Sequence, residues 1–206
     1  MALLDQVLII TGITVLVLIS PGPDMVIVVK NTFAAGRTGG LLTSAGILAG
    51  NLVHISYCVI GIGWLISQSI VAFSVLRYAG AAYLVYLGVT TLLTDPAELE
   101  PTGNEKPRSG RGWFVQGFIN NVLNPKGTLF YLGVFTMVIT PDTTATATIL
   151  LIALMMSICA VFWLIFVATL DHPSVRQFIA RSQRTVNRMF GVLLVTIGLR
   201  VAVLDR

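Results

Sequence analysis

Two long stretches of this chain, residues 41–66 and 145–170, contain no Asp, Glu, Lys or Arg. A helix that crosses a bilayer needs about 20 mostly apolar residues, and each stretch is long enough to supply one. Only 11% of the 206 residues are charged and 55% are hydrophobic, whereas a soluble domain carries about 25% charged residues. Too little polar surface is left for a water-soluble particle, so the sequence predicts an all-α integral membrane protein in contact with lipid.

Composition excludes several other classes. The net charge of +4 does not indicate nucleic-acid binding, because the basic residues lie between apolar runs and form no patch interleaved with aromatic residues. Cys58 and Cys159 lie inside apolar runs and provide neither a disulfide framework nor the spacing of a metal site. We expect no cofactor and no metal. No basic segment precedes the first apolar run and no small-residue cleavage site follows it, so we expect the N-terminal segment to be retained.

The apolar pattern predicts six transmembrane helices. The polar stretch "DPAELEPTGNEKPRSGRG" after the third of them holds three prolines and is typical of an exposed linker. We therefore divide the chain into two three-helix halves, residues 1–94 and 112–206, joined by a cytoplasmic linker at 95–111. The six predicted spans are approximately residues 3–29, 41–66, 71–94, 113–139, 145–170 and 186–204.

The distribution of Lys and Arg predicts the orientation, because cytoplasmic loops are enriched in both. With the N-terminus outside, the predicted cytoplasmic residues are Lys30, Arg37, Lys106, Arg108, Arg111, Arg176, Arg181, Arg184 and Arg188, those outside are Arg77, Arg200 and Arg206, and Lys126 lies within the membrane. Both termini are then predicted to lie outside the cytoplasm. A five-span topology with one re-entrant segment stays open, since the first span is broken and the sixth is short.

An odd number of spans per half predicts an inverted-topology repeat of the kind found in many secondary transporters. "YAGAAYLVYLG" (78–88) and "MFGVLLVTIG" (189–198) are the third spans of their halves, and each carries two glycines. The first spans match better, because Pro23-Asp24 and Pro125-Lys126 each place a helix breaker directly before an ionisable residue. Paired interruptions at corresponding positions are the best sequence indication of a transporter's binding site.

Broken helices suit the binding of a zwitterion. Proline removes a backbone donor and clashes with the preceding turn, and backbone groups freed at membrane depth are tolerated only inside protein or beside a water-filled cavity. A half-helix N-terminus favours a carboxylate, whereas freed carbonyls favour an ammonium group. We therefore predict a substrate and ion site, without catalytic residues, made of Pro21, Gly22, Pro23, Asp24, Asn51, His54, Asn120, Asn121, Asn124, Pro125 and Lys126.

Each of these side chains also has a purely structural interpretation. Asp24 either marks a proton or substrate path or caps the second half-helix. Lys126 pairs with Asp24, binds a substrate carboxylate, or binds freed carbonyls. The three asparagines serve binding and helix packing equally well. His54, with Asn51 one turn before it, is either a proton relay or is satisfied by a neighbouring carbonyl.

Four motifs along the chain resemble the LysE/RhtB family of amino-acid exporters: "SPGPDM", "GILAGNLVH", "YAGAAYLVYLG" and "GFINNVLNPKGTLF". The resemblance covers nearly the whole chain, and Arg77 stands where a lysine is expected. It implies export of amino acids or related small metabolites across a bacterial inner membrane, coupled to proton entry. It does not identify the subfamily, whose members export lysine and arginine, homoserine and threonine, leucine, or cysteine derivatives.

Other functions are less compatible with the sequence. An enzyme needs a convergent acid–base or metal set, which these spans lack, and the linker has no P-loop for ATP hydrolysis. A passive facilitator or channel, or a membrane scaffold, remains the alternative. Titratable groups favour protons over sodium as the coupling ion, and the single intramembrane acid, Asp24, favours neutral substrates such as threonine, homoserine or leucine. Gly46 and Gly50 form a small-xxx-small face that would serve a homo-oligomer as easily as a contact within the chain.

Overall fold

The computed structural model describes residues 3–20, 22–68, 70–93, 109–140, 142–170, 172, 181–182, 184–185, 188–189, 191–196 and 198–200. These residues form helices and turns, without a strand among them, so the predicted all-helical class is confirmed. Six helices are described from their first to their last residue: α1 (Leu3–Ile19), α2 (Pro23–Gln68), α3 (Ile70–Leu93), α4 (Gly110–Val122), α5 (Pro125–Val138) and α6 (Ala145–Thr169).

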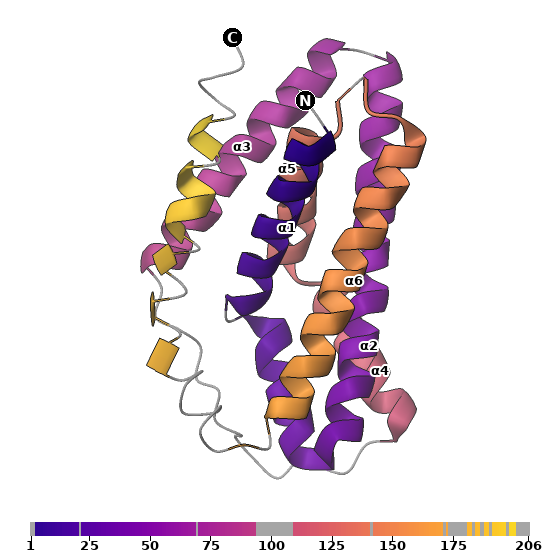
Figure 1. Ribbon diagram of the computed structural model, residues 1–206, viewed down its shortest axis with the longest axis vertical. Helices are drawn as coiled ribbons and strands as arrows, with labels where there is room; N and C mark the ends of the chain where they lie inside the picture. Colours follow the sequence, from indigo (N-terminus) through magenta and orange to yellow (C-terminus); the bar gives the residue numbers. More distant parts are fainter. Residues whose placement is uncertain are drawn as a thin grey trace.

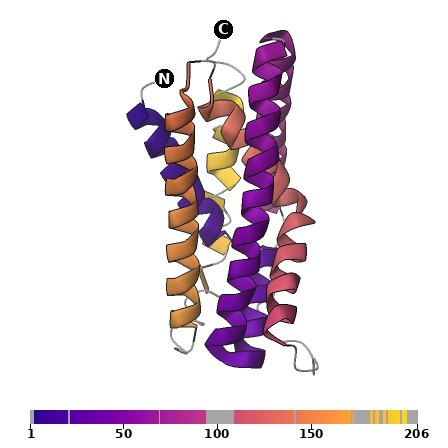
Figure 2. The same ribbon diagram turned by 90° about the vertical axis from the view of Figure 1, so that its right-hand side faces the viewer.

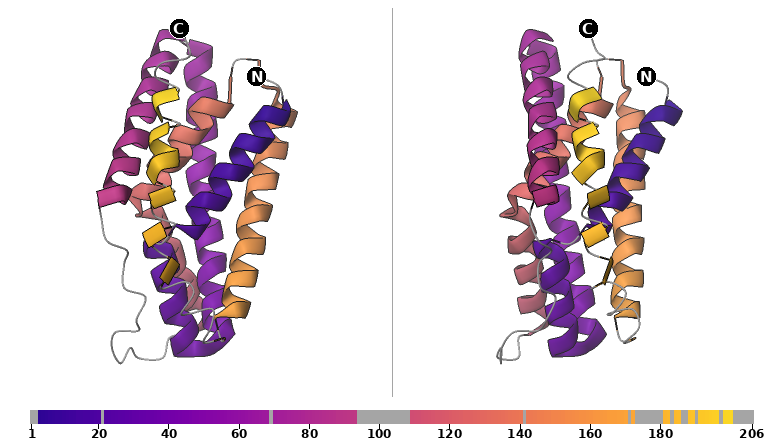
Figure 3. Two further views of the ribbon diagram at one scale, coloured as in Figure 1. Left: turned by 60° about the vertical axis from the view of Figure 1, so that its left-hand side comes forward. Right: turned by 90° about the vertical axis from the view of Figure 1, so that its left-hand side faces the viewer.

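The helices lie side by side in an elongated bundle (Figure 1). α1 descends from one end of the bundle to its middle, and the first part of α2 continues to the far end. The second part of α2 returns along the whole bundle, and α6 descends beside it (Figure 2). α4 rises from the far end and α5 continues upward from it. The described C-terminal residues also rise toward the end at which α1 begins (Figure 3).

α2 contains two helices joined at a sharp turn. Gly36 has φ 65° and ψ −163°, and Ala35 before it is also non-helical. Glycine adopts a positive φ at no steric cost, which explains its position at the reversal. The predicted first span ended at residue 29 and the second began at 41, with a loop between them. That boundary is wrong, because helix continues on both sides up to this two-residue turn.

Within the described residues, two helical segments are long and apolar enough to cross a bilayer: Pro23–Ile62, which includes the turn at Gly36, and Ala145–Thr169. The segments Leu3–Ile19, Tyr78–Leu93 and Gly191–Arg200 are apolar but shorter. The predicted span 145–170 agrees with α6 to within one residue. Most of the predicted linker lies outside the described residues, but its last part is helical, because α4 begins at Gly110 and Ser109 caps it.

Close contact between α2 and α4 depends on glycine. A Cβ added to Gly46 would overlap the backbone of Phe114, and one added to Gly117 would overlap the backbone of Thr43. A Cβ on Gly50 would overlap the side chain of Asn121. The predicted close helix contact of Gly46 and Gly50 is therefore confirmed, and it lies within one chain. This contact brings the polar side chains of α4 to the axis of the bundle.

Two apolar clusters lie above and below the middle of the bundle. One joins α1, α5 and α6 through buried residues that include Ile10, Phe135 and Met155. The other joins α2 and α6 and includes Val28 and Val167. Between these clusters both α1 and α4 end, and the buried polar residues of the bundle's centre gather there.

Candidate functional site

Two helix breaks face each other in the middle of the bundle. α1 ends at Ile19, and α2 begins at Pro23. α4 ends at Val122, and α5 begins at Pro125 after Leu123 and Asn124. Each proline occupies the first position of a new helix, where its missing N–H leaves no bond unmade. The breaks are therefore built into the fold, at the positions where the sequence predicted them.

Asp24, in the first turn of α2, connects the two breaks. Its Oδ1 accepts a hydrogen bond from Asn120 Nδ2 at 2.7 Å, and its Oδ2 accepts one from Asn121 Nδ2 at 2.8 Å. Asn121 Nδ2 also donates to Asn51 Oδ1 at 3.0 Å. Bonds to an ionised acceptor are about twice as strong as neutral ones. Asp24 is thus held by side chains from another helix, which the interpretation as a helix cap alone does not explain.

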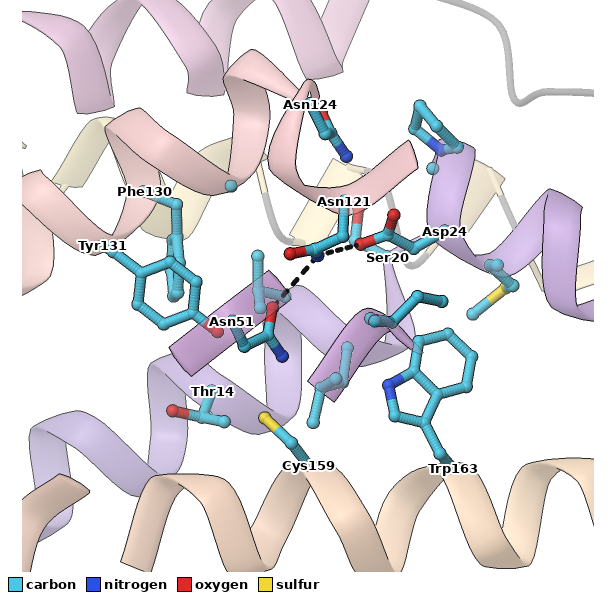
Figure 4. A pocket seen from close by; sticks show the side chains of 17 residues that line it. Thr14, Ser20, Asp24, Asn51, Asn121, Asn124, Phe130, Tyr131, Cys159 and Trp163 are labelled. Carbon is cyan, nitrogen blue, oxygen red and sulfur yellow. Dashed lines mark hydrogen bonds between the residues drawn. The ribbon is translucent and has the colours of Figure 1, made fainter. Parts of the chain in front are cut away.

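A small cavity lies beside Asp24 and encloses about 70 Å³ of space for the centres of water molecules. One water needs about 10–15 Å³ by this measure, so the cavity has room for roughly five. Figure 4 shows the side chains around it. The lining comes from α1, α2, α4, α5, α6 and the two breaks: Thr14, Val17, Leu18, Ser20, Gly22, Pro23, Asp24, Met25, Ile47, Asn51, Asn121, Asn124, Gly127, Phe130, Tyr131, Cys159 and Trp163.

Among the described residues, three buried polar atoms in this lining have no hydrogen-bond partner: Thr14 Oγ1, Asn121 Oδ1 and Trp163 Nε1. Their side chains are at most 3% exposed. An unsatisfied buried polar group costs about 1–3 kcal/mol and needs an explanation in each case. Three such atoms in the wall of one cavity can be satisfied by water or by a polar ligand that enters it.

His54 lies beside the cavity but does not line it. Its side chain is 1% exposed. Nε2 lies 3.0 Å from the backbone oxygen of Asn121, and Nδ1 lies 2.5 Å from the hydroxyl of Tyr57 and 3.3 Å from that of Thr128. This geometry matches the structural interpretation, a histidine satisfied by a neighbouring carbonyl. It also supports the end of α4 from which Asn121 projects.

A second, open groove adjoins the cavity. It has a volume of about 640 Å³ and runs along α4 from Gly112 past Gln116 to Asn120. Pro23 and Asn124 border both spaces. The hydrogen bond from Asn120 to Asp24 therefore lies where the groove and the cavity meet.

The predicted site residues largely come together. Asn51, Asn121 and Asn124 line the cavity with Asp24, and Asn120 reaches Asp24 from the groove. Pro21 lies outside the described residues, as do the side chains of Pro125 and Lys126. The predictions that involve them stay predictions.

Sequence reasoning missed Thr14, Tyr131, Cys159 and Trp163, all of which line the cavity. The available signal was weak. A hydroxyl or an indole N–H within an apolar run needs a partner when it is buried, but the run does not show which way it faces. Among the described residues, no group of three or more His, Cys, Asp or Glu side chains could hold a metal ion.

The chain is similar to known membrane proteins along almost its whole length. It is 26% identical over 197 residues to the uncharacterized membrane protein YrhP of Bacillus subtilis, covering 91% of this chain and 94% of YrhP. It is 27% identical over 202 residues to the uncharacterized membrane protein YahN of Escherichia coli, covering 96% and 89%. It is 29% identical over 197 residues to the leucine efflux protein of Salmonella typhimurium, covering 93% and 92%.

No solved structure matches the chain. The sequence profile of the LysE type translocators matches residues 15–204. Translocators move a solute rather than convert it. From the profile match and the site at the paired helix breaks, we conclude that this protein is a membrane transport protein, not an enzyme, and belongs to the LysE type translocator family.

Proposed function

We propose that this protein exports neutral amino acids, such as leucine, threonine or homoserine, or related small metabolites, across the bacterial inner membrane in exchange for protons. The observation that carries the proposal is Asp24, a carboxylate in the wall of a central cavity where, among the described residues, Thr14 Oγ1, Asn121 Oδ1 and Trp163 Nε1 have no hydrogen-bond partner. An ammonium group is the natural partner of such a carboxylate. The substrate class is supported by the relatives named leucine efflux proteins.

The proposed site is small and has a single described acid. Its apolar lining includes Met25, Ile47 and Cys159, which favours a short apolar or hydroxylated side chain over a long cationic one. A dibasic substrate would bring a second positive charge, for which the described lining has no second carboxylate. The outward direction rests on the family resemblance.

Proton coupling is the second part of the proposal. Asp24 is a titratable group that the substrate ammonium and a proton would neutralise in turn, so that binding of one favours release of the other. Lys126 follows the second break and is proposed to pair with Asp24 or to bind the substrate carboxylate. The residues of both breaks complete the proposed ion-binding set, and His54 is proposed to support Asn121 rather than to bind the ion itself.

The proposed architecture is an inverted repeat of two three-helix halves, residues 1–94 and 112–206, with the linker at 95–111 in the cytoplasm. Reciprocal contacts support it. A Cβ on Gly88 would lie 2.6 Å from the backbone oxygen of Gly191, and one on Gly198 would lie 2.6 Å from that of Ala81. The last glycine of the 78–88 motif therefore lies against the start of the 189–198 motif. The last glycine of the 189–198 motif lies in turn against the start of the 78–88 motif.

The proposed orientation places both termini outside the cytoplasm. Arg37, at the turn of α2, donates to the backbone oxygen of Ala168 at the end of α6 at 3.2 Å. α4, whose first turn contains Arg111, begins at the same end of the bundle (Figure 1). Basic residues at this end support its assignment to the cytoplasm.

The test uses inside-out membrane vesicles that contain the protein, in which export appears as uptake. Radiolabelled leucine, threonine, homoserine and lysine are supplied with and without an acidic lumen. Accumulation of one or more neutral amino acids only with the gradient supports the proposal. Amino-acid uptake that is the same with and without the gradient favours the alternative, a passive facilitator or channel. No movement of any amino acid removes the substrate assignment and leaves a scaffold role as the alternative.

A further inference from the structure

We propose that Asn51 and Trp163 together bind the carboxylate of the transported amino acid, opposite its ammonium group at Asp24. This inference deepens the proposed function and rests on it. It assigns a role to α6, from which no site residue was predicted, and it makes an α-carboxylate a requirement for tight binding.

The first step concerns the orientation of two amides. An ionised Asp24 accepts hydrogen bonds only, so Asn121 must face it with the nitrogen, Nδ2. The same Nδ2 meets Asn51 at 3.0 Å, so the Asn51 atom at that contact must be the oxygen. Asn51 Nδ2, a donor, is therefore directed elsewhere. The charge of Asp24 thus determines which end of Asn51 faces the cavity.

The second step concerns the two donors. Figure 4 shows the amide nitrogen of Asn51 and the indole nitrogen of Trp163 turned toward the interior of the cavity. Trp163 Nε1 has no hydrogen-bond partner, although the residue is only 3% exposed. Asn51 is 5% exposed, and its Nδ2 is the end of the amide that does not meet Asn121. Two neutral N–H donors turned toward one cavity fit the two oxygens of a carboxylate.

The third step concerns charge and rigidity. Asn51 and Trp163 are neutral donors in the lining, so they can bind a carboxylate without forming an ion pair with Asp24 themselves. The indole ring of Trp163 packs edge-on against Phe162 and Phe166, at centroid distances of 5.2 and 5.7 Å. These contacts hold its N–H in place before the substrate arrives, which limits the entropy lost on binding.

Trp163→Phe tests the proposal, because it removes the N–H and keeps the ring contacts. Trp113→Phe is the matched control, since Trp113 is also buried but does not line the cavity. The probes are the best amino-acid substrate of the wild type, chosen from leucine, threonine and homoserine, and the amino alcohol made by reducing its carboxylate. The half-saturation concentration of the first and the inhibition constant of the second are measured in the same vesicles.

We expect Trp163→Phe to raise the half-saturation concentration of the amino acid about tenfold or more, because a hydrogen bond to a charged group is lost. Inhibition by the amino alcohol should change by less than about twofold. Asn51→Asp, which replaces the second donor by an acceptor, should weaken binding of the amino acid more than binding of the amino alcohol. Trp113→Phe should change neither constant.

The outcomes separate this proposal from the proposed function. If Trp163→Phe and Asn51→Asp reach wild-type levels in the membrane and bind both probes as the wild type does, the carboxylate site is overturned while amino-acid transport stands. Equal weakening of both probes overturns it too, because the lost contact is then not to the carboxylate. If the wild type moves no amino acid, the proposed function falls, and this inference falls with it.

Discussion

The two helix breaks have the same backbone design but different side chains. Each ends a helix at mid-bundle and starts a new one with proline. The break between α1 and α2 supplies Asp24, a charge with two acceptor oxygens. The break between α4 and α5 follows Asn120 and Asn121, which supply the neutral donors that hold this charge.

This difference shows how a charge is accommodated at membrane depth. An ionised carboxylate alone there is costly. The amide donors of Asn120 and Asn121 hold the charge in place and lower that cost. If this interpretation is correct, the two breaks have unequal roles: the first should determine transport and coupling, and the second should determine affinity.

Asp24→Asn should have the largest effect. It removes the charge proposed to bind both proton and ammonium, so gradient-driven accumulation should fall about 10–100-fold or more. Uptake into inside-out vesicles measures this. Asp5→Asn, which changes an exposed acid in the first turn of α1, is the matched control. If Asp24→Asn accumulates substrate to the wild-type level, Asp24 serves only as a helix cap.

Lys126→Met tests whether the second break also carries a functional charge. If Lys126 pairs with Asp24 or the substrate, transport should fall about tenfold and its pH dependence should flatten, because one member of the coupled set is gone. Initial rates across a pH series measure both. Lys30→Met removes a lysine of α2 outside the cavity lining and serves as the control. Equal rates and equal pH dependence would exclude Lys126 from the site.

Gly46→Ala tests the contact that brings the breaks together. Its Cβ would overlap the Phe114 backbone, so we expect a loss of about 1–3 kcal/mol in stability. Gly61→Ala has nothing within 4 Å of its new Cβ and should be neutral or stabilising by up to about 1 kcal/mol. Thermal melting of the purified proteins in detergent compares them. Equal melting temperatures of Gly46→Ala and Gly61→Ala would mean that moving α2 and α4 apart costs little stability.

Asn121→Ala and Asn120→Ala compare the two donors of the second break. Asn121 is 1% exposed and bonds both Asp24 and Asn51, whereas Asn120 is half-buried and has one such bond. The half-saturation concentration should rise about tenfold for the first and about threefold for the second. Substrate titration in vesicles measures both. The reverse order would place the binding step in the groove rather than in the cavity.

His54→Gln should have the smallest effect on coupling. Within the described residues, the ring nitrogens of His54 contact Asn121, Tyr57 and Thr128, and not Asp24. The ratio of uptake with and without the gradient should therefore stay at the wild-type value at each pH. A shift of the pH profile by about one unit would instead identify His54 as a proton relay.

Much of the fold could be predicted from patterns along the chain. The uncharged run at 145–170 indicated α6, and Pro23 and Pro125 indicated where helices would be interrupted. These signals are local, since a proline or an apolar run acts on its own segment whatever lies beside it. The end of the first span could not be predicted in the same way, because helix continues past Lys30 and stops only where Gly36 reverses the chain.

The membrane as solvent, the helical class and the two breaks follow from the amino-acid sequence, because apolar length and proline constrain each segment directly. The partners across the bundle were decided by the tertiary structure. Nothing local to Asp24 identifies Asn120 and Asn121 as its donors, or identifies Trp163 as the opposite wall. Those contacts depend on how closely α2 and α4 approach at Gly46 and Gly50, and on which face α6 turns inward. Such distances arise only when all the helices pack together.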